Sequence, residues 1–499
     1  MSISLPFAWP QIAYRTHLPP AEQVERDGIT GLLGGMAVCF VTGLIFRFLG
    51  RRHRIGAPLY AKEAMAVVGL SWVSATVLGA LPYYLSGTQV EAGQPITFIE
   101  AMFESQSGFS TTGATVLTDL ESAGLVPHCI LFWRSWTHFL GGLGIVVLFV
   151  AILGQGSAGK AMMRAEMPGP TKEGSMPRMQ HTALVFAAIY VGLNIVLTII
   201  YAIEGMSPFD SLCHAFGTMA TGGFSTYNRS LGGFDSPLIE STTIVFMILA
   251  GTNFTLLYLT LIGRPSRLLH DVEFRAFAGI IGLVTFGIVF FGMRTGDVGF
   301  ETLASSIRNG LFQVVSILTT TGYGTADFNQ WNNFGRGILL LLMFVGGCAG
   351  STGGGMKVIR HVLFYKILRS EVERAHRPRV VRPLRMGGTP VDDPRLPGQI
   401  LLYFCMVLAI FTFSWLGLIT LEPNSTWKGQ TEHKLVDTAS AVAATLNNIG
   451  PGLGVVGATQ NYAGFSQGAK LLFTWLMMLG RVEIFSVLLL FVPSFWRRV

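Results

Sequence analysis

Long runs of apolar residues alternate with shorter polar segments along almost the whole chain. A helix needs about 20 apolar residues to cross the hydrocarbon core of a bilayer, and nine runs are roughly this long. They lie at 29–49, 64–85, 127–153, 182–203, 238–262, 274–293, 335–365, 398–421 and 469–495. The pattern predicts an all-α, polytopic membrane protein with nine spans.

Four of the connections between these runs contain a second, shorter apolar stretch of helical character. At about 10 to 16 residues these stretches are too short to cross a bilayer, and their length is typical of re-entrant segments. They lie at 98–109, 209–219, 303–318 and 437–446. We therefore predict four half-helices that enter the membrane from one side and turn back.

A Gly-centred turn follows each predicted half-helix. The four turns read Ser110-Thr111-Thr112-Gly113, Met219-Ala220-Thr221-Gly222, Thr319-Thr320-Thr321-Gly322 and Asn447-Asn448-Ile449-Gly450. Irregular backbone at membrane depth is tolerated only where protein buries it or where it lines a water-filled cavity. A single turn of this kind can simply let helices pack closely, but four in register favour one shared pore. Half-helices that aim their C-terminal ends at this pore would favour a cation over an anion.

Each of four pseudo-repeats then consists of a span, a re-entrant pore helix, a Gly loop and a second span around one central pore. The predicted boundaries are 1–60 for an N-terminal segment with one span, 61–155 for repeat 1, 156–265 for repeat 2, 266–375 for repeat 3 and 376–499 for repeat 4. The second span of repeat 3 is predicted to be broken, because six Gly between 346 and 355 disfavour a regular helix.

The composition agrees with a membrane protein and the charges give its orientation. Half of the residues are apolar, 13% are charged and the mean hydropathy is +0.51, which leaves too little polar surface to cover a water-soluble protein of 499 residues. Most Lys and Arg lie in the connections at 50–62, 154–181, 263–275 and 357–395, so these are expected in the cytoplasm and the Gly turns face outward. The formal charge of +7 does not indicate nucleic-acid binding, because the basic residues are dispersed and have no reader motif.

Several segments carry a specific resemblance to one family. They are 103–116 (FESQSGFSTTGATV), 346–357 (GGCAGSTGGGMK), 443–452 (AATLNNIGPG) and 480–485 (GRVEIF), with 164–170 (RAEMPGP) as a further match. These segments resemble the Trk/Ktr/HKT superfamily of potassium transporters, and most closely its bacterial TrkH branch. The likeness covers nearly the whole chain from about residue 60. It implies a pore-forming subunit for potassium uptake in the bacterial cytoplasmic (inner) membrane, and not an enzyme.

The resemblance implies that the Gly of each turn belongs to a potassium filter. Matched by motif, the filter residues are Thr112, Gly113, Thr221, Gly222, Thr321, Gly322, Asn448 and Gly450. Members that prefer potassium have Gly at all four places and a Ser at the first is associated with sodium, so Gly113 favours potassium. Carbonyl oxygens would replace the hydration shell of the ion, and potassium loses less on dehydration than sodium does.

The resemblance also implies an intramembrane gate below the filter. Its residues are Gly346, Gly347, Gly350, Ser351, Thr352, Gly353, Gly354, Gly355, Lys357 and Arg481. Arg481 lies deep in the last span, where a charge costs about 2.5 to 3.5 kcal/mol and therefore needs a partner. The resemblance makes the gate loop this partner, and a local pair with Glu483 is the alternative. Lys357 has a second interpretation as a marker of the cytoplasmic boundary.

No cofactor is expected in this chain, and the potassium ion is its substrate. The resemblance implies a homodimer and a cytosolic TrkA-type regulator that carries the nucleotide, and no nucleic acid is expected as a partner. The basic segment 369–395 would dock an acidic surface or lipid headgroups, unless it is a purely topogenic loop. TrkH-type chains begin with two spans before the first repeat, whereas one is predicted here, so residues 1–28 look like the end of a missing helix and its following loop.

Two other functions remain open from the sequence. The first is potassium symport with protons or sodium, for which His138, Glu100, Glu104 and Asn253 could form a relay, although such groups more often cap helices. Glu104 is expected instead to raise the local cation concentration. The second is a membrane enzyme acting on lipid-linked substrates, which would need a convergent acid, base or metal site. The His residues are dispersed and no HExxH motif or Asp-rich cluster occurs.

Overall fold

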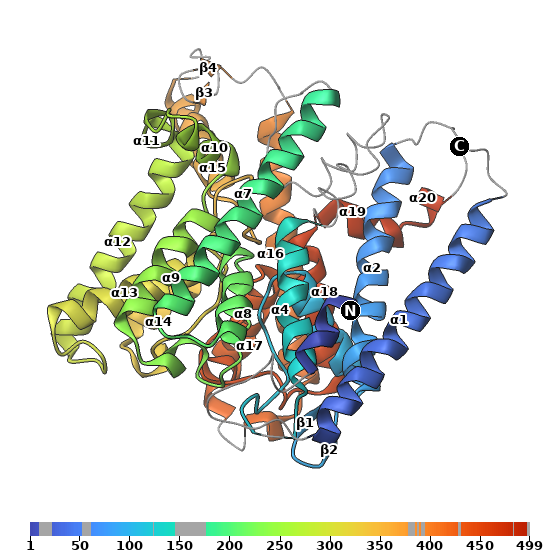
Figure 1. Ribbon diagram of the computed structural model, residues 1–499. Helices are drawn as coiled ribbons and strands as arrows, with labels where there is room; N and C mark the ends of the chain where they lie inside the picture. The colour runs from blue at the N-terminus through green and yellow to red at the C-terminus, as the bar shows by residue number, and fades with distance from the viewer. Residues whose placement is uncertain are drawn as a thin grey trace.

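The computed structural model describes residues 1–8, 22–51, 61–122, 124–144, 176–377, 385–386, 389–390, 395–427, 431–482 and 484–496. The match at 164–170, Glu483 and part of the basic segment 369–395 therefore lie outside the described residues. In the described part the chain is almost entirely helical (Figure 1). Its strands form two short antiparallel hairpins, β1 Gln89–Glu91 with β2 Gln94–Pro95 and β3 Arg385–Met386 with β4 Thr389–Pro390.

Five helices of the described part are long and apolar enough to cross a membrane without interruption. They are α1 Glu22–Gly50, α2 Ala61–Leu85, α7 Met176–Ile203, α12 Val272–Thr295 and α16 Leu396–Leu421, and each coincides with a predicted span. Large apolar side chains such as Phe40, Leu283 and Phe413 stand exposed on their outer faces. Apolar surface on this scale requires lipid around it, so the chain is a multi-pass membrane protein.

Three of the other predicted spans are interrupted helices. They are α9 Pro237–Ala250 with α10 Phe254–Leu261, α14 Asn333–Leu342 with α15 Val358–His376, and α18 Gln467–Arg481 with α19 Ile484–Leu488. The fourth, predicted at 127–153, is described only as far as Gly144 and contains α4 His128–Leu143. The break predicted between 346 and 355 is present, since α14 ends at Leu342 and α15 begins at Val358. The prediction of a continuous span at 238–262 was wrong, because the chain bends by 104° after Gly251 and Asn253 caps a new helix. The span predicted at 469–495 likewise stops at Arg481, where Val482 takes an extended conformation.

Four short, largely buried helices match the predicted half-helices. They are α3 Phe98–Phe109, α8 Pro208–Met219, α13 Leu303–Leu318 and α17 Lys434–Leu446. Three of them begin where the hydroxyl of Thr97, Ser207 or Thr302 accepts a hydrogen bond from the backbone N–H three residues later. Such a cap satisfies one of the free N–H groups at the start of a helix, so each segment begins at a defined residue.

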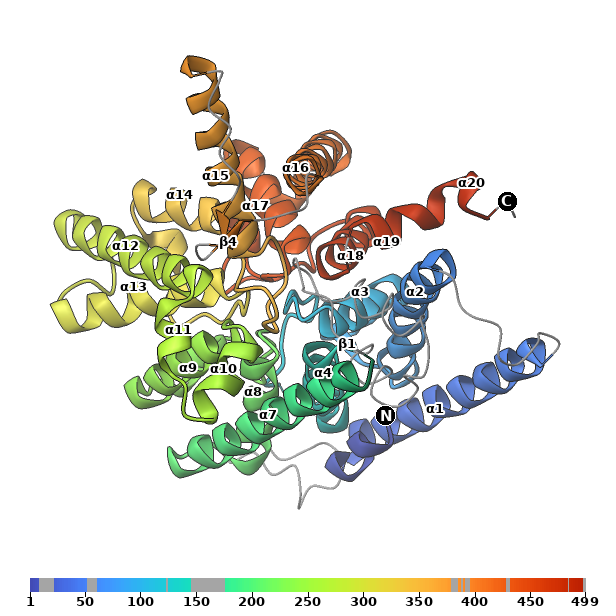
Figure 2. The same cartoon turned by 90° about the horizontal axis from the view of Figure 1, so that it is seen from above.

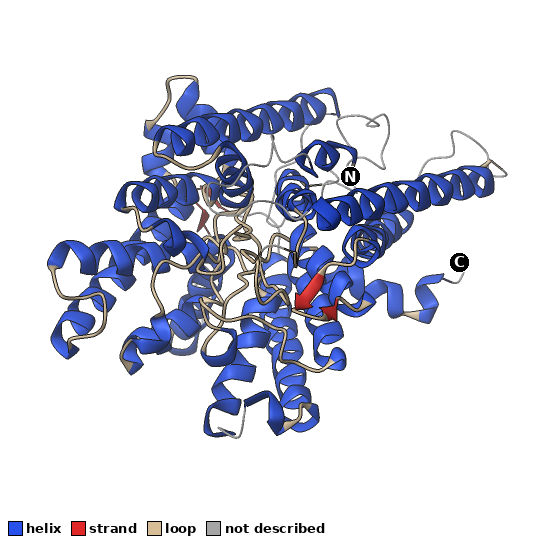
Figure 3. Cartoon of the chain, turned by 60° about the horizontal axis from the view of Figure 1, so that its bottom comes forward, coloured by secondary structure: helices blue, strands red, loops and turns tan. Residues whose placement is uncertain are grey.

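The order of long helix, half-helix, turn and second helix occurs four times in the described part of the chain, and the four groups surround one centre. Figure 2 shows α2 to α4, α7 to α9, α12 to α14 and α16 to α18 following one another around this centre. The loops that join them gather in the middle of the molecule (Figure 3).

Short elements complete the described part of the chain. They are η1 Ser2–Ala8, η2 Ser230–Phe234, α11 Ser266–His270, η3 Phe328–Gln330, η4 Asn424–Trp427, η5 Thr431–His433, η6 Gly454–Val456, η7 Leu489–Phe491 and α20 Pro493–Trp496. Among them η1 lies against α4, where Phe7 stacks on Phe132 with ring centroids 3.9 Å apart.

Candidate functional site

The four half-helices end in turns of the same backbone geometry. In each turn one residue has a left-handed φ of 53° to 60° although it is not a glycine; these residues are Thr111, Thr221, Thr320 and Asn448. The next residue donates its N–H to a carbonyl five positions earlier at 2.8 to 2.9 Å, in the pairs Thr112 to Ser107, Gly222 to Gly217, Thr321 to Ser316 and Ile449 to Ala444. The residue after that is a glycine with a φ of 76° to 96°, and these glycines are Gly113, Gly223, Gly322 and Gly450.

This geometry corrects the predicted register in two places. Gly223, and not Gly222, holds in the second turn the position that Gly113 holds in the first. The sequence match was wrong by one residue, because the second turn contains two successive glycines and the Thr-Gly pair selected the first of them. In the fourth turn Ile449 holds the position of Thr112, whereas Asn448 corresponds to Thr111.

The four glycines lie so close to neighbouring carbonyls that no side chain fits. A Cβ atom at Gly113 would collide with the carbonyl oxygen of the next turn, and the same holds around the circle. The four pairs are Gly113 with Gly222, Gly223 with Thr321, Gly322 with Ile449, and Gly450 with Thr112. The turns therefore form a closed ring. In this ring the carbonyl of the residue before each ring glycine lies against the ring glycine of a neighbouring turn.

Side chains near the ring fix the turns to one another. Asn448 Nδ2 donates to Thr112 Oγ1 at 2.9 Å and to the carbonyl of Met477 at 2.8 Å, which ties the fourth turn to the first. The hydroxyl of Thr112 also pairs with Ser110, and Thr321 pairs in the same way with Thr319. Since turns with a left-handed Thr or Asn are strained, such contacts help to hold them in place.

A cavity of about 110 Å³, which we call the outer cavity, lies on the side of the ring toward which the chain runs after each ring glycine. All four ring glycines line this outer cavity, together with Arg134, Ser225 and Asn228 among others. Asn228 donates to Asp119 Oδ1 at 2.8 Å and so joins the loops after the first and second turns. Burial raises the pKa of Asp119, but the hydrogen bonds from Asn228 and Ser122 outweigh it and lower that pKa to about 2.

In three of the turns, a buried polar side chain nine residues before the ring glycine binds the loop that follows the turn. The chemical group differs from one turn to the next. Glu104 accepts from Thr115 Oγ1 at 2.6 Å and from Val116 N at 2.7 Å, and it forms an ion pair with Arg134 at 3.0 Å. His214 and Gln313 occupy the same position in the second and third turns. His214 Nε2 lies 2.9 Å from Ser225 Oγ, and the amide oxygen of Gln313, turned toward the loop, accepts from Thr325 N at 3.0 Å.

The charge of Glu104 does not serve the role expected from the sequence. The carboxylate is completely buried and paired with Arg134, so it does not add free negative charge to the outer cavity. Two other residues of the suggested relay are also structural. Glu100 caps α3 and accepts from Lys470 Nζ at 2.6 Å, and Asn253 caps α10.

The glycine-rich segment 346–355 lies on the opposite side of the ring, against the residues that precede the ring glycines. Gly354 N donates to Thr320 Oγ1 at 2.8 Å, and a Cβ atom on Gly354 would lie 2.6 Å from Cβ of Asn448. A Cβ atom on Gly353 would lie 3.1 Å from the carbonyl oxygen of Thr319. The loop therefore touches the third and fourth turns directly.

The bend between α9 and α10 binds this loop. The sequence analysis did not predict this contact. Cys348 N donates to the carbonyl of Gly251 at 2.8 Å, and Thr352 Oγ1 donates to that of Ala250 at 3.1 Å. Glu273 on α12 accepts from the backbone of Ala349 at 2.7 Å and of Ile359 at 3.0 Å. The available signal was the run Gly251-Thr252-Asn253 inside an apolar stretch, because Gly and Asn mark helix ends.

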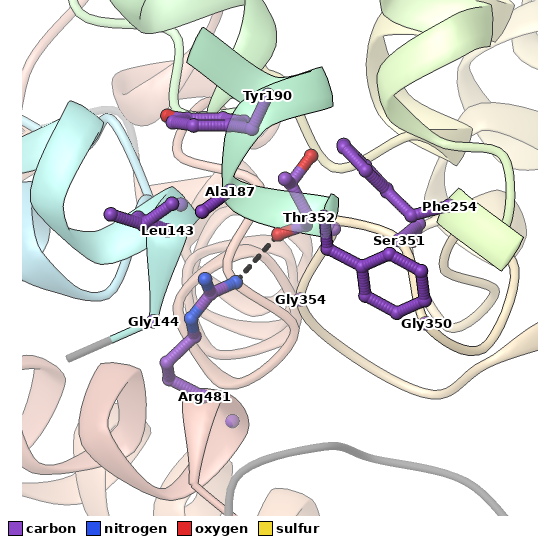
Figure 4. Close-up of a pocket in the computed structure, with 14 residues that line it drawn as sticks. Leu143, Gly144, Ala187, Tyr190, Phe254, Gly350, Ser351, Thr352, Gly354 and Arg481 are labelled. Atoms are coloured by element: carbon purple, nitrogen blue, oxygen red, sulfur yellow. Dashed lines mark hydrogen bonds between the residues drawn. The ribbon is translucent and has the colours of Figure 1, made fainter. Parts of the chain in front are cut away.

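Arg481 joins the loop to the end of α4. Its Nη1 donates to the carbonyl of Thr352 at 2.7 Å and its Nη2 to that of Gly141 at 2.5 Å. Figure 4 shows Arg481 pointing toward Thr352 across a cavity of about 100 Å³ that is also lined by Tyr190 and Phe254.

Lys357 is buried beneath the same loop. Its Nζ donates to the carbonyl of Gly353, and none of its side chain is exposed to solvent. This burial does not fit a residue that only marks the boundary of the membrane. Glu483, the alternative partner of Arg481, is not among the described residues, and no group of His, Cys, Asp and Glu within the described ranges could hold a metal ion.

The chain is similar over most of its length to known transport proteins. The model of the TrkH family, described as cation transport protein, matches residues 32–498. The Trk system potassium uptake protein TrkH of Salmonella typhimurium is 37% identical over 467 residues, which cover 92% of this chain and 91% of that protein. TrkH of Escherichia coli is 38% identical over 446 residues, which cover 88% and 87%.

A solved structure has the same fold. The crystal structure of the potassium transporter TrkH from Vibrio parahaemolyticus aligns with a TM-score of 0.82 and 33% sequence identity. The alignment covers 99% of this chain and 96% of that one.

Proposed function

Because the chain belongs to the TrkH family of cation transport proteins, we propose that it is the pore-forming subunit of a Trk-type potassium uptake system in the bacterial cytoplasmic membrane. The observation that carries the proposal is the closed ring of four turns, in which backbone carbonyls and side-chain-free glycines meet around one centre. Membership of a transport family replaces the alternative of an enzyme acting on lipid-linked substrates.

The proposed filter consists of the ring glycines Gly113, Gly223, Gly322 and Gly450 and the carbonyls of the residues before them, Thr112, Gly222, Thr321 and Ile449. These carbonyl oxygens would take the place of water around a potassium ion. The four half-helices reach the ring with their C-terminal ends, whose partial negative charge stabilises a dehydrated cation. Both effects exclude anions, and the exchange of water for carbonyl oxygens favours the cation that is easier to dehydrate.

The proposed gate is the loop 346–355 with Lys357 and Arg481. In the described conformation the loop contacts the inner side of the ring through Gly353 and Gly354, so it stands in the path of an ion leaving the filter. Arg481 would hold it there through the carbonyl of Thr352. Opening then requires the loop to break this contact and to move away from Thr320.

The organisation around this pore follows the same proposal. The repeats would be 61–155, 156–265, 266–375 and 376–499 after an N-terminal segment of 1–60, in agreement with the recurring element order. The chain would act as a homodimer with a cytosolic TrkA-type regulator that binds the nucleotide, and the cytoplasmic connections would carry the docking surface. Potassium itself is the substrate, and the chain needs no cofactor.

Growth rescue tests the proposed function. Expression in a bacterium without potassium uptake systems should restore growth at low potassium, more strongly when the regulatory subunit is present. Protein that reaches the membrane in normal amounts but restores no growth and no potassium flux would refute the proposal. Flux in liposomes at varied pH and sodium concentration separates a channel from a symporter, because a symporter stops without its coupling ion.

A further inference from the structure

The second turn differs from the other three in the residue that precedes the ring glycine. This position is Thr112, Thr321 or Ile449 in the first, third and fourth turns, each with a branched side chain. In the second turn it is Gly222. Two successive glycines give a backbone few conformational restraints of its own, so this turn needs support from elsewhere.

The space that a side chain of Gly222 would use is occupied by the ring of His138 on α4. A Cβ atom on Gly222 would lie 2.5 Å from Nδ1, 2.6 Å from Cγ and 2.7 Å from Cε1 of that ring. These are the three nearest atoms, and all of them belong to His138. Unlike Gly223, whose φ is 76°, Gly222 does not have a left-handed conformation. Its lack of a side chain is therefore explained by the imidazole alone.

The imidazole is held by packing. His138 is completely buried; its ring lies beside the backbone of Ser107, but neither ring nitrogen has a hydrogen-bond partner of good geometry within the described part of the chain. Its ring stacks on Phe224 with centroids 4.2 Å apart and planes inclined by 15°. Because a close-packed interior transmits displacements, the place of this ring and the place of the second turn depend on each other.

Arg134, which lies four residues before His138 on α4, contacts the residues that follow Gly223. Its guanidinium carbon lies 3.8 Å from the centre of the Phe224 ring, and its Nη1 donates to the carbonyl of Ser225 at 3.2 Å. Side chains of α4 thus contact the second turn on both sides of Gly223. The support of this turn comes from a helix of the first repeat.

We propose that His138 is a positioning residue for ion selection: it takes the place of a side chain at Gly222 and so fixes the Gly222 carbonyl within the ring. The proposal rests on the proposed function of the ring as a potassium filter. It implies that His138 and Gly222 act as one complementary pair and not as two independent positions.

The test is a double-substitution cycle read out as the ratio of potassium to sodium uptake. His138→Ala leaves the turn without support and Gly222→Ala drives a methyl group into the ring, so each should lower the ratio at least about threefold. The double variant, in which the new methyl group enters the vacated space, should return to within about twofold of the unchanged protein. A ratio unchanged in His138→Ala, or a double variant no better than the worse single one, would overturn the proposal.

Matched variants separate this effect from a general loss of structure. Gly223→Ala combined with His138→Ala should show no recovery, because the obstacle at Gly223 is its φ and the carbonyl of Thr321. Recovery there as well would contradict the assigned pairing. His270→Ala, on the exposed helix α11, and Gly279→Ala, where a Cβ atom meets nothing within 4 Å, serve as controls for the two types of substitution.

A binding measurement keeps the test independent of uptake and of poor expression. Thermal unfolding of the purified protein is followed in potassium chloride and in sodium chloride, since an ion that binds the folded state raises the melting temperature. His138→Asn, a milder change, replaces any variant that does not accumulate. A smaller difference between the two salts in His138→Asn supports the proposal, and an unchanged difference refutes it. If the unchanged protein binds potassium but carries none, only the proposed function fails.

Discussion

Replacing Arg481 by Ala removes the charged group that holds the loop 346–355 against the end of α4. Two hydrogen bonds are lost, of 2.7 Å to the carbonyl of Thr352 and of 2.5 Å to that of Gly141, but only the first reaches the loop. A hydrogen bond to a charged group contributes about 1.5 to 3 kcal/mol, and the partial exposure of Arg481 places it at the lower end. A loss of about 1.5 kcal/mol changes the ratio of closed to open molecules about tenfold.

The assay is the initial rate of potassium flux into liposomes that contain the purified chain without a regulator. If most molecules are closed, Arg481→Ala should conduct about ten times faster, and Arg481→Lys should fall between, since one ammonium group cannot reproduce both contacts. Arg294→Ala, at an exposed position on α12, controls for the loss of a positive charge. Wild-type flux in Arg481→Ala at equal protein amounts would show that this side chain does not hold the loop.

Four further outcomes follow from the same geometry. Gly113→Ser should lower the potassium-to-sodium flux ratio, because its φ of 80° and the adjacent carbonyl leave no room for Cβ; an unchanged ratio would remove this glycine from the filter. Thr320→Ala deprives the N–H of Gly354 of its acceptor, worth about 1 kcal/mol, so the leak of potassium should rise several-fold, while Thr320→Ser should stay near wild type. Arg134→Ala leaves a buried carboxylate unpaired at a cost of about 3 to 5 kcal/mol, which should appear as a marked drop in melting temperature; an unchanged melting temperature would contradict this. Asp119→Asn should destabilise the chain at neutral pH. Since the pKa of Asp119 falls to about 2 on folding, its contribution is present above about pH 3.8 and is lost toward pH 2, so the two melting curves should converge in acid; a constant difference would refute the assignment.

The lengths of the apolar runs were sufficient to predict the uninterrupted helices and the half-helices. The start of α3 at Phe98 and of α13 at Leu303 follows from Thr97 and Thr302, which are good caps and stand next to apolar residues. The bend after Gly251 was harder to predict, because α9 and α10 are both apolar and only their tertiary contacts decide where the helix stops. Its cause is visible in the loop 346–355, whose N–H groups bind the carbonyls exposed at the bend.

The register of the second turn could not be read from a local motif. Thr221-Gly222 resembles Thr112-Gly113 and Thr321-Gly322, yet the hydrogen bond from Gly222 N to the carbonyl of Gly217 places Gly222 one position earlier. The ring of His138, which is far away in the sequence, fills the space beside Gly222 where the other three turns carry a side chain. A match of short motifs compares neighbours along the chain, and it cannot detect a contact between residues that are neighbours only in space.

The position nine residues before the ring glycine shows what it means to build a ring from one polypeptide. Glu104, His214, Gln313 and Ala441 stand there, so one architectural place holds an anion, an imidazole, an amide and a methyl group. In a pore made of four identical subunits a single codon change would alter all four quadrants together. Here each of the four turns can mutate and be selected independently. Replacing one repeat by a copy of another within this chain would therefore place a side chain of the wrong chemistry against the neighbouring loops.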